Sequence, residues 1–455
     1  MNKTNSITKN WLIRGNNFLI KYYITGRYFI DHLCFFKQTI SSNHIYAGQT
    51  HNRSYDPLLE SKNLVLLSYN ILSQTLLEQH SYLYKMCPRQ ALIWKHRFQL
   101  IMSEVRTIKP DIICFQEVQL SHLDEIKCSL RALGFETVFK KRTGNKPDGC
   151  AISYRTKFFN LVKLNNVEFF QPKEDVLKFD NIGLMVKLIY KGDKSSSFVV
   201  CTTHLLFNRK RTDARLAQIQ VLLAELDKFS YNKEVSHHLP ILLTGDFNSS
   251  PQSPVTKLVT SGKLTEKQFV KPLRNISITG MCQHLDVHLE RNGETAKRKR
   301  SLLDHAEKNC SEMNPNNVSD IVSVAKKETE NLRDKMCGAL SLISSITEIN
   351  TDRSKEHNHL FQYSVIKHNF VFKSVYNHLK TDGRTEATVF QNKWTVVDYI
   401  YYSSNSVTGS LVLEEKYYLP TVQECYKVRA LPSFKYGSDH VSLAAKFIFY
   451  FKKFK

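Results

Sequence analysis

The sequence predicts a layered α/β protein, because apolar strands alternate with helices along most of its length. Short continuous apolar runs such as LVLLSYNIL (64–72) and DIICFQEV (111–118) are typical of strands that are covered on both faces. Between these two runs, residues 91–107 show the apolar spacing of an α-helix, and Pro110 closes that helix.

The remaining elements continue the alternation. A helix over 121–133 leads through Gly134 to a further strand, and residues 212–230 have the spacing of an amphipathic helix. The other predicted strands are apolar runs, several of which lead into polar loops: 150–155, 181–190, 197–205, 239–248, 369–376, 393–403 and 440–449.

Two segments differ from this globular pattern. Residues 1–60 are predicted to form a leader, and residues 61–455 a catalytic domain with an insertion over 291–357 that is poor in aromatics and predicted to be disordered. The first thirty residues are basic and free of acid, with recurring apolar residues. They resemble a mitochondrial presequence, and an untargeted flexible tail is the alternative.

Charge and cysteine usage narrow the partners and the compartment. The 455 residues carry a formal net charge of +22, which favours an anionic partner such as nucleic acid or an anionic membrane. No apolar run reaches the roughly 18 residues of a membrane span.

The ten cysteines contain no Cys-x-x-Cys pair, which indicates an intracellular protein without a zinc or redox motif. We expect the cytoplasm or the mitochondrion, and KRKR (297–300) adds the nucleus as an option.

Polar residues that can bind metal or phosphate stand at the ends of apolar runs in six places. They are Asn70, Glu117, His204, Asp246 with Asn248, Asp398, and Asp439 with His440. A single residue of this kind usually caps a loop. Six of them in this order and spacing make coincidence improbable. A carboxylate that holds Mg²⁺ is what hydrolysis of an anionic phosphodiester needs, and Mg²⁺ prefers such hard oxygen ligands.

In order and spacing, these six segments resemble the endonuclease/exonuclease/phosphatase superfamily, which includes DNase I, abasic-site endonucleases and the Ccr4-type deadenylases. The resemblance covers residues 62–451 apart from the insertion. Within the superfamily, the chain is most similar to the Angel proteins of the Ccr4/nocturnin branch. That narrower resemblance is carried by KPDGCAISYR (146–155), DNIGLMVKL (180–188) and THLLFNRKRTDARLAQIQVLLAEL (203–226).

The resemblance implies a fold and a place for the site. The expected fold is a four-layer α/β sandwich of the DNase I type, with two mixed β-sheets face to face and helices outside. The active site is then expected in a cleft at one end of the sheets, where the six loops converge.

The resemblance also implies how a metal is held. Glu117 is expected to be the principal ligand of Mg²⁺, for which Mn²⁺ is an alternative. Asn70 is expected to lie beside Glu117 and touch metal-bound water or phosphate. Asp439 is expected to bind the metal directly or to support it through a water. Asp246 is expected to orient or deprotonate the attacking water.

The remaining four residues are expected to act on the phosphate. Asn248 would hold a non-bridging oxygen, and His204 would contact the scissile phosphate from the other side. His440 would donate to the phosphate as charge grows, with Asp398 fixing its tautomer. Every member of the set has the residue type that this chemistry needs, so the sequence predicts an active enzyme.

Substrate contacts are predicted from the segment that follows His204. It contains Asn208, Lys210, Arg211 and Arg215, which are expected to bind RNA phosphates at the mouth of the cleft. A solvated turn before a helix is the alternative. A loop with Arg142, Lys146 and Asp148 is a further candidate for framing the terminal nucleotide.

The expected function is Mg²⁺-dependent hydrolysis at RNA 3′ ends. The Angel resemblance implies removal of 2′,3′-cyclic phosphates, and the wider branch implies 3′→5′ exonucleolytic trimming, including poly(A). The sequence leaves both open, because both reactions use the same metal and the same water-activating group. A small-molecule phosphate, as nocturnin suggests, is a third substrate class.

A binding role belongs to another class of function. In that alternative the chain is a translation or RNP adaptor that recruits partners through its leader. YFIDHLC (28–34) is close to the Tyr-x-x-x-x-Leu-apolar motif that docks on the translation cap-binding factor. The intact catalytic set argues against an exclusively binding role.

Overall fold

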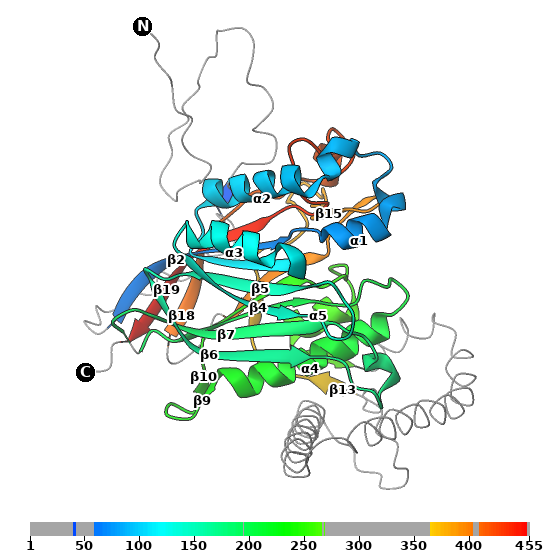
Figure 1. The fold of residues 1–455 in the computed structure, drawn as a ribbon. Coiled ribbons are helices and arrows are strands. Elements are labelled where there is room, and N and C mark those ends of the chain that lie inside the picture. Colours follow the sequence, from blue (N-terminus) through cyan, green and yellow to red (C-terminus); the bar gives the residue numbers. More distant parts are fainter. Residues whose placement is uncertain are drawn as a thin grey trace, which may run out of the picture.

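In the computed structural model, two β-sheets pack face to face and helices cover their outer surfaces (Figure 1). The structure describes residues 40–41, 59–193, 195–265, 268, 365–403 and 409–452. This arrangement confirms the four-layer α/β sandwich. Most of the predicted leader and all of the predicted insertion lie outside the described residues, and so do KRKR and YFIDHLC.

The first sheet has seven strands and carries helices α2 (Trp94–Ile108) and α3 (Leu123–Arg131) on its outer face. Strands β2 and β3 are parallel, and the other neighbours are antiparallel. The strand order is β1 (Ile40–Ser41), β18 (Gly409–Lys416), β19 (Leu443–Lys452), β2 (Leu59–Asn70), β3 (Ile112–Gln119), β5 (Asp148–Arg155) and β4 (Phe135–Lys141).

The second sheet has six strands and packs on α4 (Thr212–Ser230) and α5 (Pro254–Ser261). Its parallel pair is β8 and β11. The strand order is β14 (Phe372–Ser374), β17 (Asp398–Ser403), β11 (Ile241–Asp246), β8 (Phe198–His204), β7 (Ile182–Tyr190) and β6 (Phe159–Glu168).

Short elements complete the described fold. The two-stranded pairs are β9 (Tyr231–Asn232) with β10 (His237–His238), β12 (Lys263–Thr265) with β13 (Val365–Lys367), and β15 (Val389–Phe390) with β16 (Trp394–Thr395). The short helices are α1 (Gln74–Gln79), α9 (Val422–Cys425) and the 3₁₀ turns η1 (Ser81–Tyr84), η2 (Arg89–Leu92), η3 (Leu120–His122) and η4 (Asp175–Leu177). Among the described helices, none combines the length and apolar character needed to cross a bilayer.

The core lies between the two sheets and follows the two-residue period of a strand. In β2, Leu64 and Leu66 face the second sheet, whereas Leu67 and Tyr69 pack with helices α2 and α3. Both faces of this strand are therefore covered, which explains its continuous apolar sequence. Each fully buried aliphatic or aromatic side chain contributes about 1.5–3 kcal/mol through the hydrophobic effect.

Three features differ from the sequence predictions. Helix α4 was predicted to be amphipathic, but it is buried on nearly all sides because the second sheet and α5 both contact it. The predicted strand 393–403 is divided into β16 and β17. Strands β6 and β18 were not predicted, and most residues of β6 are exposed, so no apolar run marked it.

A buried arginine fixes the two connections that lead into the site. Arg97 of α2 is fully buried, and its guanidinium donates to the carbonyl oxygens of Ile71, Leu72 and Gly437 at 2.9–3.0 Å. The first two carbonyls follow strand β2, and the third precedes β19. A Cβ on Gly437 would lie 2.4 Å from the carbonyl oxygen of Arg97, so only glycine permits this close packing.

Replacing this guanidinium is expected to destabilise the fold. Arg97→Met leaves three buried carbonyls without their donor, and each loss costs about 1 kcal/mol or more. We expect the free energy of unfolding to fall by about 3 kcal/mol, measured by chemical denaturation. Arg106→Met is the matched control, because Arg106 lies exposed on the same helix. Equal stability of the two variants would contradict the role of Arg97.

Candidate active site

The register of the strands brings the predicted site residues together. Asp246, the last residue of β11, pairs with His204 of β8 on one side and with Asp398 of β17 on the other. In the first sheet, Asn70 ends strand β2 beside Glu117 of β3. These strand ends meet at one end of the sandwich, so residues from both sheets share one site.

Glu117 points into the site because β3 is irregular at this position. The pairing with β5 shifts register between Phe115 and Val118, and Glu117 has a φ of 57°. A left-handed conformation at a residue other than glycine costs of order 1–3 kcal/mol. The carboxylate then accepts from the Asn70 side chain at 3.0 Å and from the Ser73 backbone N–H at 3.0 Å.

The backbone of the GDFN segment (245–248) also adopts an unusual conformation. Gly245 has a φ of 143°, and a Cβ there would lie 2.0 Å from the carbonyl oxygen of Thr203, so the close approach of β11 to β8 requires glycine. Asn248 has a φ of 47°, and its backbone N–H donates to Asp246 at 2.9 Å. The turn thereby orients the Asp246 carboxylate.

The carboxylates form an oxygen donor set suited to a divalent cation. Glu117, His204 and Asp246 place ligand atoms within 4.8 Å of one another. Burial, assisted by the charges of Asp148 and Asp439, raises the pKa of Glu117 to about 7. Burial and the charge of Asp398 raise the pKa of Asp246 to about 8. Buried negative charge of this kind requires compensation, and a divalent cation between Glu117 and Asp246 would supply it.

Asn70 joins the two carboxylates. Its side-chain nitrogen donates to Glu117 at 3.0 Å and to Asp246 at 3.1 Å, while its side-chain oxygen accepts from the Leu72 backbone N–H. In this arrangement Asn70 positions the acidic residues. Its predicted contact with metal-bound water or phosphate stays a prediction.

His440 is held by Asp398 as the sequence suggested. Its Nδ1 lies 2.9 Å from the Asp398 carboxylate, and its Nε2 lies 3.7 Å from Asp246 and 3.8 Å from Asp439. Burial lowers the pKa of His440, but the carboxylates of Asp398, Asp439 and Asp246 outweigh it and raise this pKa well above its usual value. A protonated His440 can therefore donate from Nε2 towards an anion.

His204 is a second donor of a different kind. Burial, with the charge of Arg142 nearby, lowers its pKa well below the usual value, so the ring is neutral. The Asn248 side chain donates to Nε2 at 3.0 Å, which places the ring proton on Nδ1. This Nδ1 is buried and has no hydrogen-bond partner within the described part of the chain. The Glu117 carboxylate lies 3.9 Å from this nitrogen, and the predicted contact of His204 with the scissile phosphate stays a prediction.

The predicted contact of Asn248 with a phosphate oxygen stays a prediction. Its side-chain N–H groups donate to His204 and to the carbonyl oxygen of Leu205, both at 3.0 Å. In this structure Asn248 fixes the tautomer of His204.

A cleft cavity of about 390 Å³ opens above this cluster. Its lining includes three acidic residues of the site, the cations Arg142 and Lys146, and a group of apolar and aromatic side chains. The full lining is Leu72, Leu76, Gln79, His80, Leu83, Tyr84, Glu117, Arg142, Asn145, Lys146, Pro147, Asn181, His204, Leu206, Phe207, Asp246, Gln391 and Asp439. Arg142 is held by the buried carboxylate of Asp148 at 3.4 Å.

The four predicted substrate-binding residues are not among those that line this cavity. Arg215 is buried, and its guanidinium donates to backbone carbonyls of its own loop, including that of Leu206. Its predicted contact with RNA phosphate is therefore wrong in this structure, because the carbonyls of the loop occupy the guanidinium. Arg211 pairs with Asp213 at 2.8 Å, while Asn208 and Lys210 are exposed.

The sequence analysis missed several polar residues of the cleft, among them Tyr84 and Asn181. The Tyr84 hydroxyl donates to Asp439 at 2.9 Å, and nothing in the sequence marked it. Asn181 donates to the carbonyl oxygen of His204 at 3.0 Å. It directly precedes an apolar strand, so a search for polar residues at either end of each strand would have found it.

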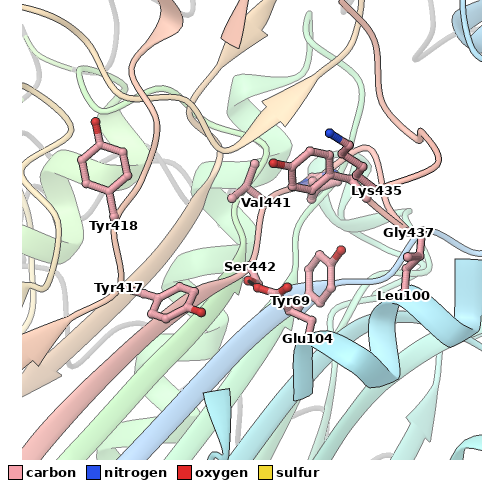
Figure 2. Close-up of a pocket in the computed structure, with 11 residues that line it drawn as sticks. Tyr69, Leu100, Glu104, Tyr417, Tyr418, Lys435, Gly437, Val441 and Ser442 are labelled. Carbon is pink, nitrogen blue, oxygen red and sulfur yellow. Dashed lines mark hydrogen bonds between the residues drawn. The ribbon is translucent and has the colours of Figure 1, made fainter. Parts of the chain in front are cut away.

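A second, smaller pocket of about 30 Å³ is lined by His440 but by no other predicted site residue (Figure 2). Ser442 donates to Glu104 of α2 at 2.9 Å within it, and Tyr69 lies beside this pair in the view. The volume suits a water molecule rather than a substrate. The contact fixes the start of β19 to α2 and so supports the segment that carries Asp439 and His440.

Fold and site together define a class of protein. A donor set for a divalent cation and a histidine that can donate to an anion are what the hydrolysis of a phosphate ester requires. The class is a phosphoester hydrolase built on a four-layer sandwich.

Comparison with known proteins gives the family. The model of the Endonuclease/Exonuclease/phosphatase family matches residues 67–440, and the chain belongs to that family. It belongs more narrowly with the Angel proteins: it is 32% identical to protein angel homolog 2 of Homo sapiens, covering 87% of this chain and 72% of that protein. The homologue of Bos taurus is 34% identical with the same coverage.

Solved structures agree with this assignment. A crystal structure of ANGEL2, a 2′,3′-cyclic phosphatase, in complex with adenosine-2′,3′-vanadate matches with a TM-score of 0.62 and 30% identity. The match covers 86% of this chain and 97% of that chain. The resemblance inferred from the sequence is confirmed.

Removing the partner of His440 is expected to impair hydrolysis. Asp398→Asn keeps the shape of the site but removes the charge that favours protonated His440. We expect kcat to fall by about 10²–10⁴-fold. The alkaline limb of the pH–rate profile should move to lower pH, because His440 then loses its proton earlier. Asp124→Asn on exposed α3 is the matched control, and an unchanged pH profile in Asp398→Asn would contradict this role.

Proposed function

We propose that this chain is a Mg²⁺-dependent phosphatase that removes 2′,3′-cyclic phosphates from RNA 3′ ends. The observation that carries the proposal is the size and the lining of the cleft. Its volume of about 390 Å³ lies near the lower end of the range for small-ligand pockets, and Glu117 and Asp246 line it. A terminal nucleotide matches this size. The related ANGEL2 structure holds an adenosine-2′,3′-vanadate, which supports a terminal ribose with its phosphate as substrate.

Removal of a cyclic phosphate takes two hydrolytic steps. In the first, water adds to phosphorus and one P–O bond to the ribose breaks, which opens the ring to a monoester. In the second, another water releases inorganic phosphate and leaves both ribose hydroxyls. In this proposal Asp246 accepts the proton of the attacking water, and the donors of His440 and His204 bind phosphoryl oxygens; the position of His440 Nε2 near Asp246 and the unpartnered Nδ1 of His204 support these roles.

The proposed cation is Mg²⁺. The site offers carboxylate oxygens, which suit this hard ion; in this proposal Glu117 is the principal ligand, with Asp439 beside it, and Asp246 stays free to act on the attacking water. When bound, Mg²⁺ would neutralise phosphate charge and lower the pKa of a bound water. The net charge of +22 is consistent with an RNA substrate.

Two other functions are separated by the same experiment. A 3′→5′ exoribonuclease has to accept a 3′-hydroxyl end and shorten the chain, and a translation or RNP adaptor needs no hydrolysis at all. The intact set of donors favours catalysis over the adaptor. The size of the cavity favours one terminal nucleotide over a longer 3′ tail.

The test uses the full chain with Mg²⁺ and short labelled RNAs that end either in a 2′,3′-cyclic phosphate or in a 3′-hydroxyl. We expect loss of the terminal phosphate without shortening, and a loss of activity of at least about 10³-fold in Glu117→Gln, because the main carboxylate donor is gone. Glu136→Gln on the exposed face of β4 is the matched control. A ladder of shortened products from the 3′-hydroxyl RNA would instead establish an exoribonuclease, and no reaction on either RNA would refute both.

Metal removal is expected to change stability as well as activity. Because burial raises the pKa of Glu117 to about 7, the ionised carboxylate is disfavoured in the folded, metal-free chain. Its contribution to stability therefore falls as pH rises from the ordinary carboxyl range through 7. At pH 8 without metal, we expect Glu117→Gln to melt at a higher temperature than wild type. Adding Mg²⁺ should raise the melting temperature of the wild type only. A rise of the same size in both proteins would contradict Mg²⁺ binding at Glu117.

A further inference from the structure

The rings of two aromatic side chains lie close together in the lining of the cleft. His80 follows helix α1, and Phe207 lies three residues beyond His204, so distant segments of the chain bring them together. Their ring centroids are 6.4 Å apart with an interplanar angle of 38°. Both residues line the same cavity as Glu117 and Asp246. The reaction centre and the ring pair therefore share one cavity.

The spacing of these rings is close to that of a sandwich around a flat molecule. Bases in nucleic acids stack about 3.4 Å apart, so two rings that hold a base between them lie about 7 Å apart. An opening of a few tenths of an ångström and a rotation that brings the rings parallel would reach this geometry. Phe207 is 40% exposed and His80 is half-buried. The ring of His80 also contacts Tyr82, which is itself 58% exposed, so such a rotation displaces surface residues rather than the core.

The rest of the lining has the polarity that a nucleotide requires. Leu76, Leu83 and Leu206 line the cavity with the ring pair and supply apolar contact, whereas Arg142 and Lys146 supply positive charge for a phosphate. A nucleotide combines a flat apolar base with an anionic phosphate. A phosphorylated sugar or a polar head group has no flat aromatic part and would leave the two rings without a partner.

We infer that His80 and Phe207 form a binding site for the base of the terminal nucleotide, which stacks between the two rings. This inference rests on the proposed function and adds a base-dependent step to substrate recognition. Stacking on a ring accepts every base, because every base has a π-face. The pair therefore selects nucleotide ends without selecting a sequence, and it holds the ribose phosphate at Glu117 and Asp246.

The test compares two substrates that differ only in the base. One is adenosine 2′,3′-cyclic monophosphate, and the other is ribose 2′,3′-cyclic phosphate. Phe207→Leu and His80→Leu each leave a side chain of intermediate size in place but remove the aromatic face. Base stacking contributes about 1–3 kcal/mol, or about 5–150-fold. We expect each variant to lose kcat/KM by an amount in this range on the adenosine substrate, mainly through KM, and to change less than about 2-fold on the ribose substrate.

Two controls separate stacking from a general effect on the loop. Phe158→Leu is the matched variant, because Phe158 is 38% exposed and does not line the cleft; it should leave both substrates unaffected. The double variant should lose less than the product of the two single losses, because both rings contact one base. Equal losses on both substrates, or no loss on either, would overturn the inference.

Failure of the proposed function would be recognised separately. If the wild type hydrolyses neither substrate, the phosphatase proposal fails, and the ring pair is tested by calorimetric binding of adenosine 3′-monophosphate and ribose 3-phosphate. Tighter binding of the adenosine compound that disappears in Phe207→Leu would support the base site. The same affinity for both compounds in the wild type would refute it.

Discussion

The burial of four carboxylates at one end of the sandwich is the constraint on which the site depends. Glu117, Asp246, Asp398 and Asp439 are each at most 9% exposed, and ionised groups are costly to bury without compensation. The protein supplies part of the compensation through His440 and through N–H and O–H donors, such as those of Asn70 and Tyr84. Burial, with like charges nearby, raises the pKa of Glu117 and of Asp246, so ionising these groups in the metal-free fold is unfavourable, and a cation at this point would offset that cost.

Holding these groups in place requires backbone that is unfavourable by itself. The left-handed conformations at Glu117 and Asn248 and the close approach at Gly245 all lie beside the reacting groups. They persist because the strands that carry them are fixed on both faces by the buried core between the sheets and under the helices. A buried bridge from Gln116 to Thr202, at 2.9 Å, also links the two sheets directly below the site. The strained conformations at the strand ends therefore depend on the rigid sandwich that holds the strands.

The sequence predicted those parts of the molecule that depend on local pattern. Apolar runs marked the inner strands, and polar residues at their ends marked Glu117, Asp246 and His440, because a strand fixes where its end lies. Strand β6 was missed because it is largely exposed. The walls of the cleft were missed for a different reason. His80, Tyr84 and Phe207 become neighbours of the site only through tertiary packing, and no periodicity encodes a distance between separate loops. Arg215 shows the converse: its charge suggested a phosphate contact, but the loop carbonyls bind it.

The arrangement of the cleft separates the groups proposed to act on phosphorus from those proposed to bind the rest of the substrate. In the proposed function the carboxylates and histidines act on the phosphorus centre, which is the same in a cyclic phosphate, a phosphodiester or a small phosphate ester. What distinguishes these substrates is the group attached to the phosphate, and that group meets the lining above the carboxylates rather than the carboxylates themselves. In this chain the lining offers cations at Arg142 and Lys146 and aromatic rings at His80 and Phe207. In the proposed function, substrate choice therefore depends on this lining, and part of the lining also supports the site: Tyr84 donates to Asp439, and burial together with the charge of Arg142 lowers the pKa of His204.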